Sequence, residues 1–124
     1  MKRPVSWTPD RQDVIWLDCN PQRGQEMRDV HPFLVLSPKA FNKRTSLVIG
    51  LPMTTASCNA DNPFAITVGV ATGRKAGQPR YVLCHQPTSF DWRLRGGIPH
   101  PMKRIPDARF ADVLALLNQI IQLA

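Results

Sequence analysis

The feature that most constrains the fold is a series of short apolar runs, each of strand length and each closed by proline, glycine or polar residues. These runs span residues 14–17, 32–36, 46–51, 64–70 and 80–85. Polar segments at 20–31, 56–63 and 72–79 separate them, and residues 86–101 fit no element clearly. Apolar runs this short, with turn signals between them, predict β-strands in a small curled sheet or barrel.

Two further segments carry helical signals. Residues 38–45 follow Ser37, which we expect to be the N-cap, and Pro38 would be the first helical residue. Near the end of the chain, apolar residues recur at spacings of three and four, at Phe110, Val113, Leu114, Leu117, Ile120 and Ile121. This stripe predicts a helix from about Asp107 to Leu123, packed on the sheet or against a second subunit. Asp107 would be its N-cap or lie in its first turn.

Length and composition limit the class of protein. A chain of 124 residues is expected to form a single domain, 1–124, in which residues 1–12 would be a loose N-terminal arm. No apolar run is long enough to span a membrane, and no secretion signal follows the basic N-terminus, so we expect a cytoplasmic protein. The cysteines, Cys19, Cys58 and Cys84, are odd in number and form no CxxC pair. We therefore expect free thiols and no metal site.

Charge points to a polyanionic partner. The formal net charge is +7 and the sequence pI is about 10.0. A small basic domain commonly binds nucleic acid, because neutralised phosphates release their condensed counterions. Trp7, Trp16 and Trp92 are aromatic side chains that could stack on bases. Composition alone therefore favours a basic α+β domain, mainly β, that binds nucleic acid.

A set of short motifs in a fixed order makes the prediction more specific. They occupy residues 14–18, 20–26, 31–38, 41–42, 52–55, 62–64, 82–86 and 91–95. Each piece is common by itself, but the ordered set resembles the MazF/PemK family of toxin endoribonucleases over nearly the whole chain. The resemblance implies an SH3-like barrel of the MazF/PemK/CcdB type, with a short helix after the second strand and a C-terminal helix.

The resemblance also implies an activity and partners. Members of the family are toxins of toxin–antitoxin systems and are usually homodimers. They cut single-stranded RNA at short sequences without metal or cofactor, through attack of a ribose 2′-OH on its own phosphodiester. The expected products are a 2′,3′-cyclic phosphate and a 5′-OH. The cognate antitoxin would cover the RNA-binding groove with an acidic, initially disordered tail, which suits a chain of charge +7.

The resemblance assigns candidate catalytic residues. The usual pair in the family is the Arg of an Arg-Pro motif and the Thr of a Pro-x-Thr motif, and Thr54 matches the second. His31 stands where the family has Arg. Either His31 replaces it as acid or base, because imidazole titrates near neutral pH, or Arg28 supplies the charge, or the chain has lost activity. Glu26 matches a loop acid of the family that would act as base or orient the cation.

The remaining candidates would contact RNA. They are Arg23, Gln86, Trp92, Arg93 and Arg95. Trp92 could instead belong to the core or to a dimer interface, Thr54 could merely cap a strand end, and His85 is expected to be structural. The sequence also allows an alternative function, namely a non-catalytic module of the same fold that binds RNA, DNA or a gyrase-like protein.

Overall fold

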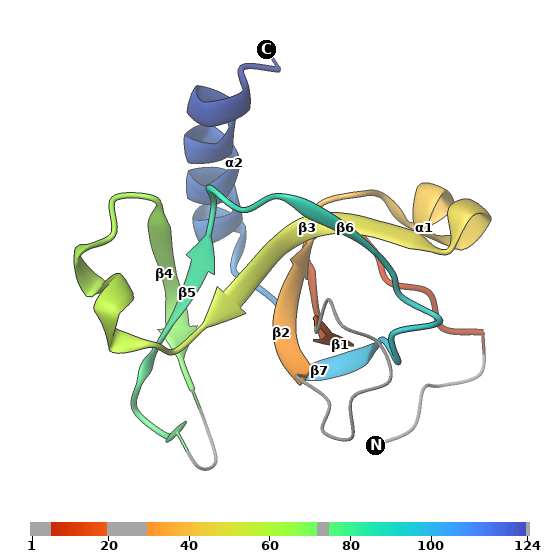
Figure 1. Ribbon diagram of the computed structural model, residues 1–124, viewed down its shortest axis with the longest axis horizontal. Helices are drawn as coiled ribbons and strands as arrows, with labels where there is room; N and C mark the ends of the chain where they lie inside the picture. The colour runs from red at the N-terminus through yellow and green to blue at the C-terminus, as the bar shows by residue number, and fades with distance from the viewer. Residues whose placement is uncertain (1–5, 20–29, 72–74, 124) are drawn as a thin grey trace.

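A computed structural model describes residues 6–19, 30–71 and 75–123 of the chain. Its elements, in chain order, are β1 (Asp13–Asp18), β2 (Val30–Val35), α1 (Lys39–Thr45), β3 (Leu47–Thr54), the short 3-10 helix η1 (Ser57–Asp61), β4 (Ala65–Val70), β5 (Pro79–Leu83), β6 (Thr88–Asp91), β7 (Ile98–Arg104) and α2 (Asp107–Ile121). The predicted fold class is confirmed, since the domain is mainly β, with a short helix after β2 and a helix at the C-terminal end (Figure 1). No helix in these ranges is long and apolar enough to cross a membrane.

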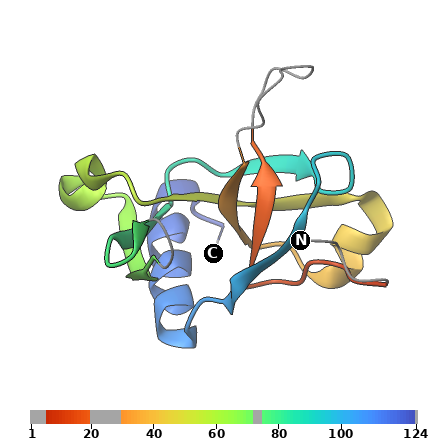
Figure 2. The same cartoon turned by 90° about the horizontal axis from the view of Figure 1, so that it is seen from below.

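The long strand β3 organises the sheet. The strand order is β4-β5-β3-β2-β1-β7, with β6 also paired to β3, and every pairing in the described residues is antiparallel. Residues 47–50 of β3 pair with β6, residues 50–52 with β2, and residues 53–54 with β5. The strand therefore changes partner along its length, and the sheet curls around it (Figures 1 and 2).

Apolar side chains fill both faces of the curled sheet. Val14 and Leu34 belong to one core cluster with α2, whereas Ile15, Leu17 and Phe33 belong to the other, which contains Trp92. Successive residues of a strand point to opposite faces, so a strand buried on both faces needs an unbroken apolar run. This explains why the short runs in the sequence do not alternate with polar residues.

Helix α2 packs its apolar stripe over part of the sheet, next to β4. Phe110, Val113 and Leu117 are buried, and Leu114 packs beside them. Ile120 and Ile121 belong to the same predicted stripe but remain about two-fifths exposed. The helix ends at Ile121 rather than Leu123, because Gln122 adopts a left-handed conformation. Asp107 lies in the first turn, as one of the alternatives predicted, and Pro106 is the N-cap.

The start of α1 differs from the prediction. Pro38 is the N-cap, no side chain caps the helix, and Ser37 lies one residue before it. The Ser37 hydroxyl is used elsewhere, because it accepts a hydrogen bond from the backbone N–H of Ile49 at 2.9 Å and bonds to Asn42. The fully buried Asn42 amide in turn donates to the carbonyl of Pro9 at 2.9 Å.

That last bond leads to a second correction, which concerns the N-terminal arm. The prediction of a loose segment over 1–12 is wrong for residues 8–12, where Thr8 and Gln12 are less than a tenth exposed. The backbone N–H of Gln12 donates to Val35 at 2.7 Å, and its side-chain amide donates to the carbonyl of Ile105 at 2.8 Å. Polar residues form this contact through buried hydrogen bonds, which apolar patterning does not reveal.

The segment 86–101, left unassigned by the sequence, contains β6 and most of β7. Prolines at 99 and 101 conceal β7, because proline is ordinarily excluded from central strands. Strand β7 lies at the edge of the sheet beside β1, where a missing backbone N–H leaves no partner unsatisfied.

Candidate active site

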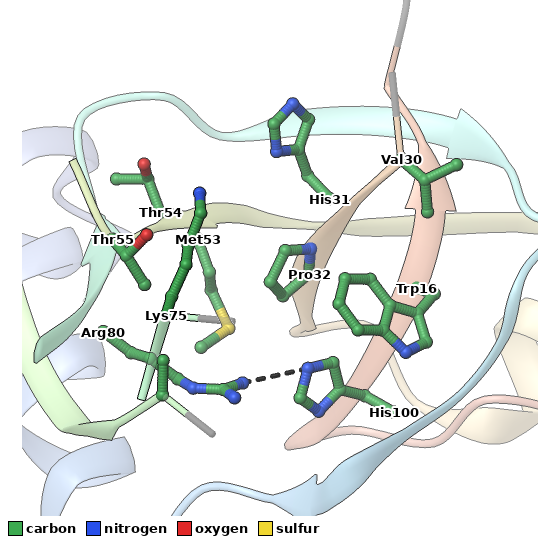
Figure 3. A pocket seen from close by; sticks show the side chains of 11 residues that line it. Trp16, Val30, His31, Pro32, Met53, Thr54, Thr55, Lys75, Arg80 and His100 are labelled. Atoms are coloured by element: carbon green, nitrogen blue, oxygen red, sulfur yellow. Dashed lines mark hydrogen bonds between the residues drawn. The ribbon is translucent and has the colours of Figure 1, made fainter. Parts of the chain in front are cut away.

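A cleft of about 590 Å³ opens where β3 leaves β2 and joins β5. The lining side chains come from β1, β2, β3, β5, β7 and the segments beside them: Trp16, Val30, His31, Pro32, Met53, Thr54, Thr55, Ala71, Lys75, Arg80 and His100 (Figure 3). The volume lies within the ordinary range of ligand-binding pockets.

The register of the sheet explains why His31 and Thr54 face the same cleft. Strands β2 and β3 are paired through Phe33 and Pro52. The same register continued by two residues would place His31 directly opposite Thr54. The ladder does not continue, since Pro32 has no N–H to donate and residues 53–54 pair with β5 instead. The two strands diverge, and the side chains of His31 and Thr54 both line the opening (Figure 3).

The hydroxyl of Thr54 is oriented by the chain that follows it. Its Oγ accepts a hydrogen bond from the backbone N–H of Ala56 at 3.1 Å, and the side chain is half-buried. The strand-end role weighed from the sequence is therefore present. Because the hydroxyl acts as acceptor in this contact, its own proton is available to donate to a group in the cleft.

The opposite side of the cleft contains a buried arginine–histidine contact. Arg80 Nη1 lies 2.9 Å from Nε2 of His100, which is 2% exposed, and the backbone N–H of Met102 points at Nδ1 of the same ring at 2.9 Å. Burial, together with the neighbouring Arg80 charge, lowers the pKa of His100 to about 4, so the ring is neutral near pH 7. Burial also lowers the pKa of the Arg80 guanidinium. The Trp16 ring packs on His100 with centroids 4.4 Å apart.

The electrostatic character of the cleft is cationic. Lys75 and Arg80 line it, and no aspartate or glutamate does so within the described residues. Three or more His, Cys, Asp or Glu side chains do not gather into a metal-binding group anywhere in ranges 6–19, 30–71 and 75–123. Such a cleft favours a phosphate-bearing ligand.

The other predicted RNA contacts lie outside this cleft. Gln86 is exposed in the turn after β5, where its backbone N–H donates to the carbonyl of Leu83 at 3.2 Å.

Arg93 is exposed, and its guanidinium carbon lies 4.4 Å from the centroid of the Trp92 ring. The same guanidinium donates to the hydroxyl of Ser46. Arg95 is half-buried and donates to the Asp18 carbonyl at 3.2 Å. These side chains stay candidates for RNA contacts beyond the cleft.

The prediction that Trp92 stacks on RNA is wrong for the described fold. Trp92 is 1% exposed, and its indole N–H donates to the carbonyl of Asn42 at 2.9 Å. A ring enclosed on all sides has no face to offer a base, so its role is the alternative one of core packing.

Three predicted residues, Arg23, Glu26 and Arg28, lie outside the described residues. His85 is exposed and does not line the cleft; its ring packs on Phe64 with centroids 5.3 Å apart. Sequence reasoning missed Arg80 and His100 as a pair. They lie 20 positions apart on different strands, and no spacing signal links them.

Comparison with known proteins identifies the family. Residues 10–121 match the family described as PemK-like, MazF-like toxin of type II toxin-antitoxin system. The chain belongs to this family. It is 35% identical over 92 residues to the endoribonuclease toxin MazF of Escherichia coli strain K12, covering 73% of this chain and 75% of that protein. It is 32% identical over 109 residues to the endoribonuclease PemK of Escherichia coli, covering 86% and 78%.

Solved structures agree with this assignment. The crystal structure of MazE-MazF (Form-II) from Deinococcus radiodurans superposes with a TM-score of 0.77 at 30% sequence identity, covering 95% of this chain and 99% of that chain. The fold and the toxin family predicted from the sequence are thus confirmed. The chain is an endoribonuclease of the MazF/PemK class, by its relationship to curated proteins of that activity.

Proposed function

We propose that this member of the MazF/PemK family cleaves single-stranded RNA at a short sequence, without a metal ion, by attack of a ribose 2′-OH on the adjacent phosphorus. The P–O5′ bond breaks, which leaves a 2′,3′-cyclic phosphate on one fragment and a 5′-OH on the other. The observation that carries the proposal is that His31 and Thr54, from two strands that diverge, line one cationic cleft.

His31 transfers protons in this mechanism. The reaction needs a base for the 2′-OH proton and an acid for the departing 5′-oxygen, and imidazole performs either role near neutral pH. His31 is half-buried and lines the cleft, so a phosphodiester can reach it while part of the surrounding water is excluded. Glu26 and Arg28 precede it in the chain and remain candidates for the complementary proton transfer or for additional charge.

Thr54 positions the phosphate. Its hydroxyl already accepts from Ala56, so it donates its proton to a non-bridging phosphate oxygen. Lys75 adds positive charge at the same cleft. A single hydrogen-bond donor directed at the oxygen where negative charge develops in the transition state raises the rate of the chemical step by about 10²–10³-fold. These side chains supply the charge stabilisation that a metal ion provides in other nucleases.

The biological setting follows from the same chemistry. A cognate antitoxin with an acidic, disordered tail fits a chain of charge +7 and a cleft lined by cations. The MazE-MazF complex from Deinococcus radiodurans supports such a partner. We further propose a homodimer that acts in the cytoplasm, where its RNA substrate occurs.

The test is cleavage of a long RNA in EDTA by the wild type and three single variants. We expect His31→Ala and Thr54→Ala to slow cleavage by about 10²-fold or more, whereas His85→Ala, a matched change at an exposed histidine outside the cleft, keeps full rate. DNA of the same sequence stays intact because it lacks the nucleophile. RNA that is bound but never cut would contradict the proposal and favour the non-catalytic binding module.

A further inference from the structure

Arg80 is a buried cation whose hydrogen-bonding capacity is largely unused. The residue is 9% exposed, and its Nε–H is buried without a hydrogen-bond acceptor. Within residues 6–19, 30–71 and 75–123, its side chain forms a hydrogen-bond contact with His100 alone, and no carboxylate in these ranges pairs with it. A buried guanidinium ordinarily bonds to a carboxylate or to several carbonyl groups, so an unsatisfied one requires an explanation.

The His100 ring cannot accept a hydrogen bond from Arg80 and from Met102 at the same time. The neutral ring offers one bare nitrogen and one N–H, yet donors face both nitrogens, namely the backbone N–H of Met102 at Nδ1 and Arg80 at Nε2. Whichever nitrogen carries the ring proton, one of these two donors lacks an acceptor. His100 therefore satisfies Arg80 only in part, and an acceptor from outside the chain would complete the site.

The position of Arg80 determines what can reach it. Arg80 lines the same cleft as His31 and Thr54, with its guanidinium directed into the opening toward His100 (Figure 3). In this view the pair lies across the cleft from His31 and Thr54, with Pro32 and Met53 between them. A strand of RNA laid through the cleft therefore passes two separate clusters of donors.

We propose that Arg80 binds a phosphate of the RNA other than the one held between His31 and Thr54. This inference rests on the proposed function, because RNA is taken as the ligand. A phosphate is favoured over the edge of a base because the Arg80 guanidinium is a buried charge that no carboxylate of the described residues neutralises. A phosphate provides a full negative charge and several oxygens that accept hydrogen bonds from the guanidinium, whereas a base edge provides only partial charges.

Binding to 2′-O-methyl oligonucleotides tests the proposal apart from cleavage, because they keep every phosphate but lack the nucleophile. Fluorescence anisotropy would give the dissociation constant of three unrelated sequences of equal length over a series of salt concentrations. We expect Arg80→Gln to weaken binding of all three by about ten- to a hundredfold. The slope of log affinity against log salt should fall by about 0.7, as for one lost phosphate contact on a single strand.

Matched variants support the assignment. Arg80→Lys keeps the charge and should keep the salt slope. Arg44→Gln, at an exposed arginine in the last turn of α1 that does not line the cleft, should change neither quantity. Unchanged affinity and slope in Arg80→Gln would overturn the proposal. So would an altered preference among sequences at an unchanged slope, which indicates base recognition. Polyglutamate, measured in the same assay, represents the acidic antitoxin tail, and a loss of affinity for polyglutamate alone would also overturn the proposal.

A measurement on the wild type keeps the test decisive if Arg80→Gln does not fold. The Nε–H of Arg80 gives a side-chain NMR signal that is absent from Arg80→Lys, which assigns it. Addition of the oligonucleotide should shift this signal, and a signal that stays in place at saturation would overturn the proposal. Cleavage that fails while phosphate binding through Arg80 persists would refute the proposed function alone.

Discussion

The buried imidazole of His100 makes the stability of the domain depend on pH in a specific way. Its pKa falls from the ordinary 6.5 to about 4 in the folded chain, mainly through burial and also through the adjacent Arg80 charge. Between these values the unfolded chain binds a proton that the folded chain does not, so stability falls as the pH drops from about 6.5 to about 4. At about 1.4 kcal/mol for each pKa unit, the loss from this one residue is about 3 kcal/mol at pH 4.

Urea unfolding of the wild type and of His100→Gln, at about pH 7 and about pH 4 and at one protein concentration, isolates this effect. Glutamine does not titrate, whereas the carboxylates and the other histidines contribute equally to both proteins. We predict that the wild type loses about 3 kcal/mol more than the variant on acidification. An equal loss in both proteins would contradict this prediction, since it would mean that the ring is protonated equally easily in the folded and unfolded chains.

Three further experiments test how tightly particular residues are packed. Gly50→Ala should prevent stable folding, measured by circular dichroism, because the new Cβ would lie 1.9 Å from a carbonyl oxygen of β2. Trp92→Phe should lower the free energy of unfolding by about 1–3 kcal/mol, because the hydrogen bond of the buried indole to the carbonyl of Asn42 is lost and the smaller ring leaves a cavity, although Ser46 still donates to that carbonyl; a loss below about 0.5 kcal/mol would contradict this. Iodoacetamide should label exposed Cys58 in the native protein but Cys84 only after unfolding, since burial raises the pKa of Cys84 to about 11; mass spectrometry of the two peptides checks this.

Much of the fold could be predicted because its signals are local. The apolar runs of β1, β2 and β3 are continuous, since both faces of those strands are buried, and the stripe of α2 has helical spacing. The cap of α1 and the packing of residues 8–12 could not be predicted. The first depends on the Ser37 hydroxyl, which bonds to Ile49 and Asn42 instead of capping the helix. The second depends on hydrogen bonds of Asn42 and Gln12 to distant backbone groups, and polar residues of this kind are also typical of loops.

The site could be predicted only in part, for a similar reason. Resemblance to the family located His31 and Thr54, and the structure places both at one cleft. The resemblance could not locate Arg80 and His100, because these two residues come together only where β5 and β7 border the same opening. Trp92 was instead predicted as a site residue and is not one. An aromatic residue in a basic segment suggests stacking on RNA, whereas its burial assigns Trp92 to the core.

Analysis of the RNA ends produced in EDTA tests the central claim most directly. We predict that the wild type releases fragments with 2′,3′-cyclic phosphate and 5′-OH ends, and that His31→Ala releases almost none while still binding RNA. Fragments with 5′-phosphate ends, cleavage that requires added Mg²⁺, or full activity in His31→Ala would each contradict it.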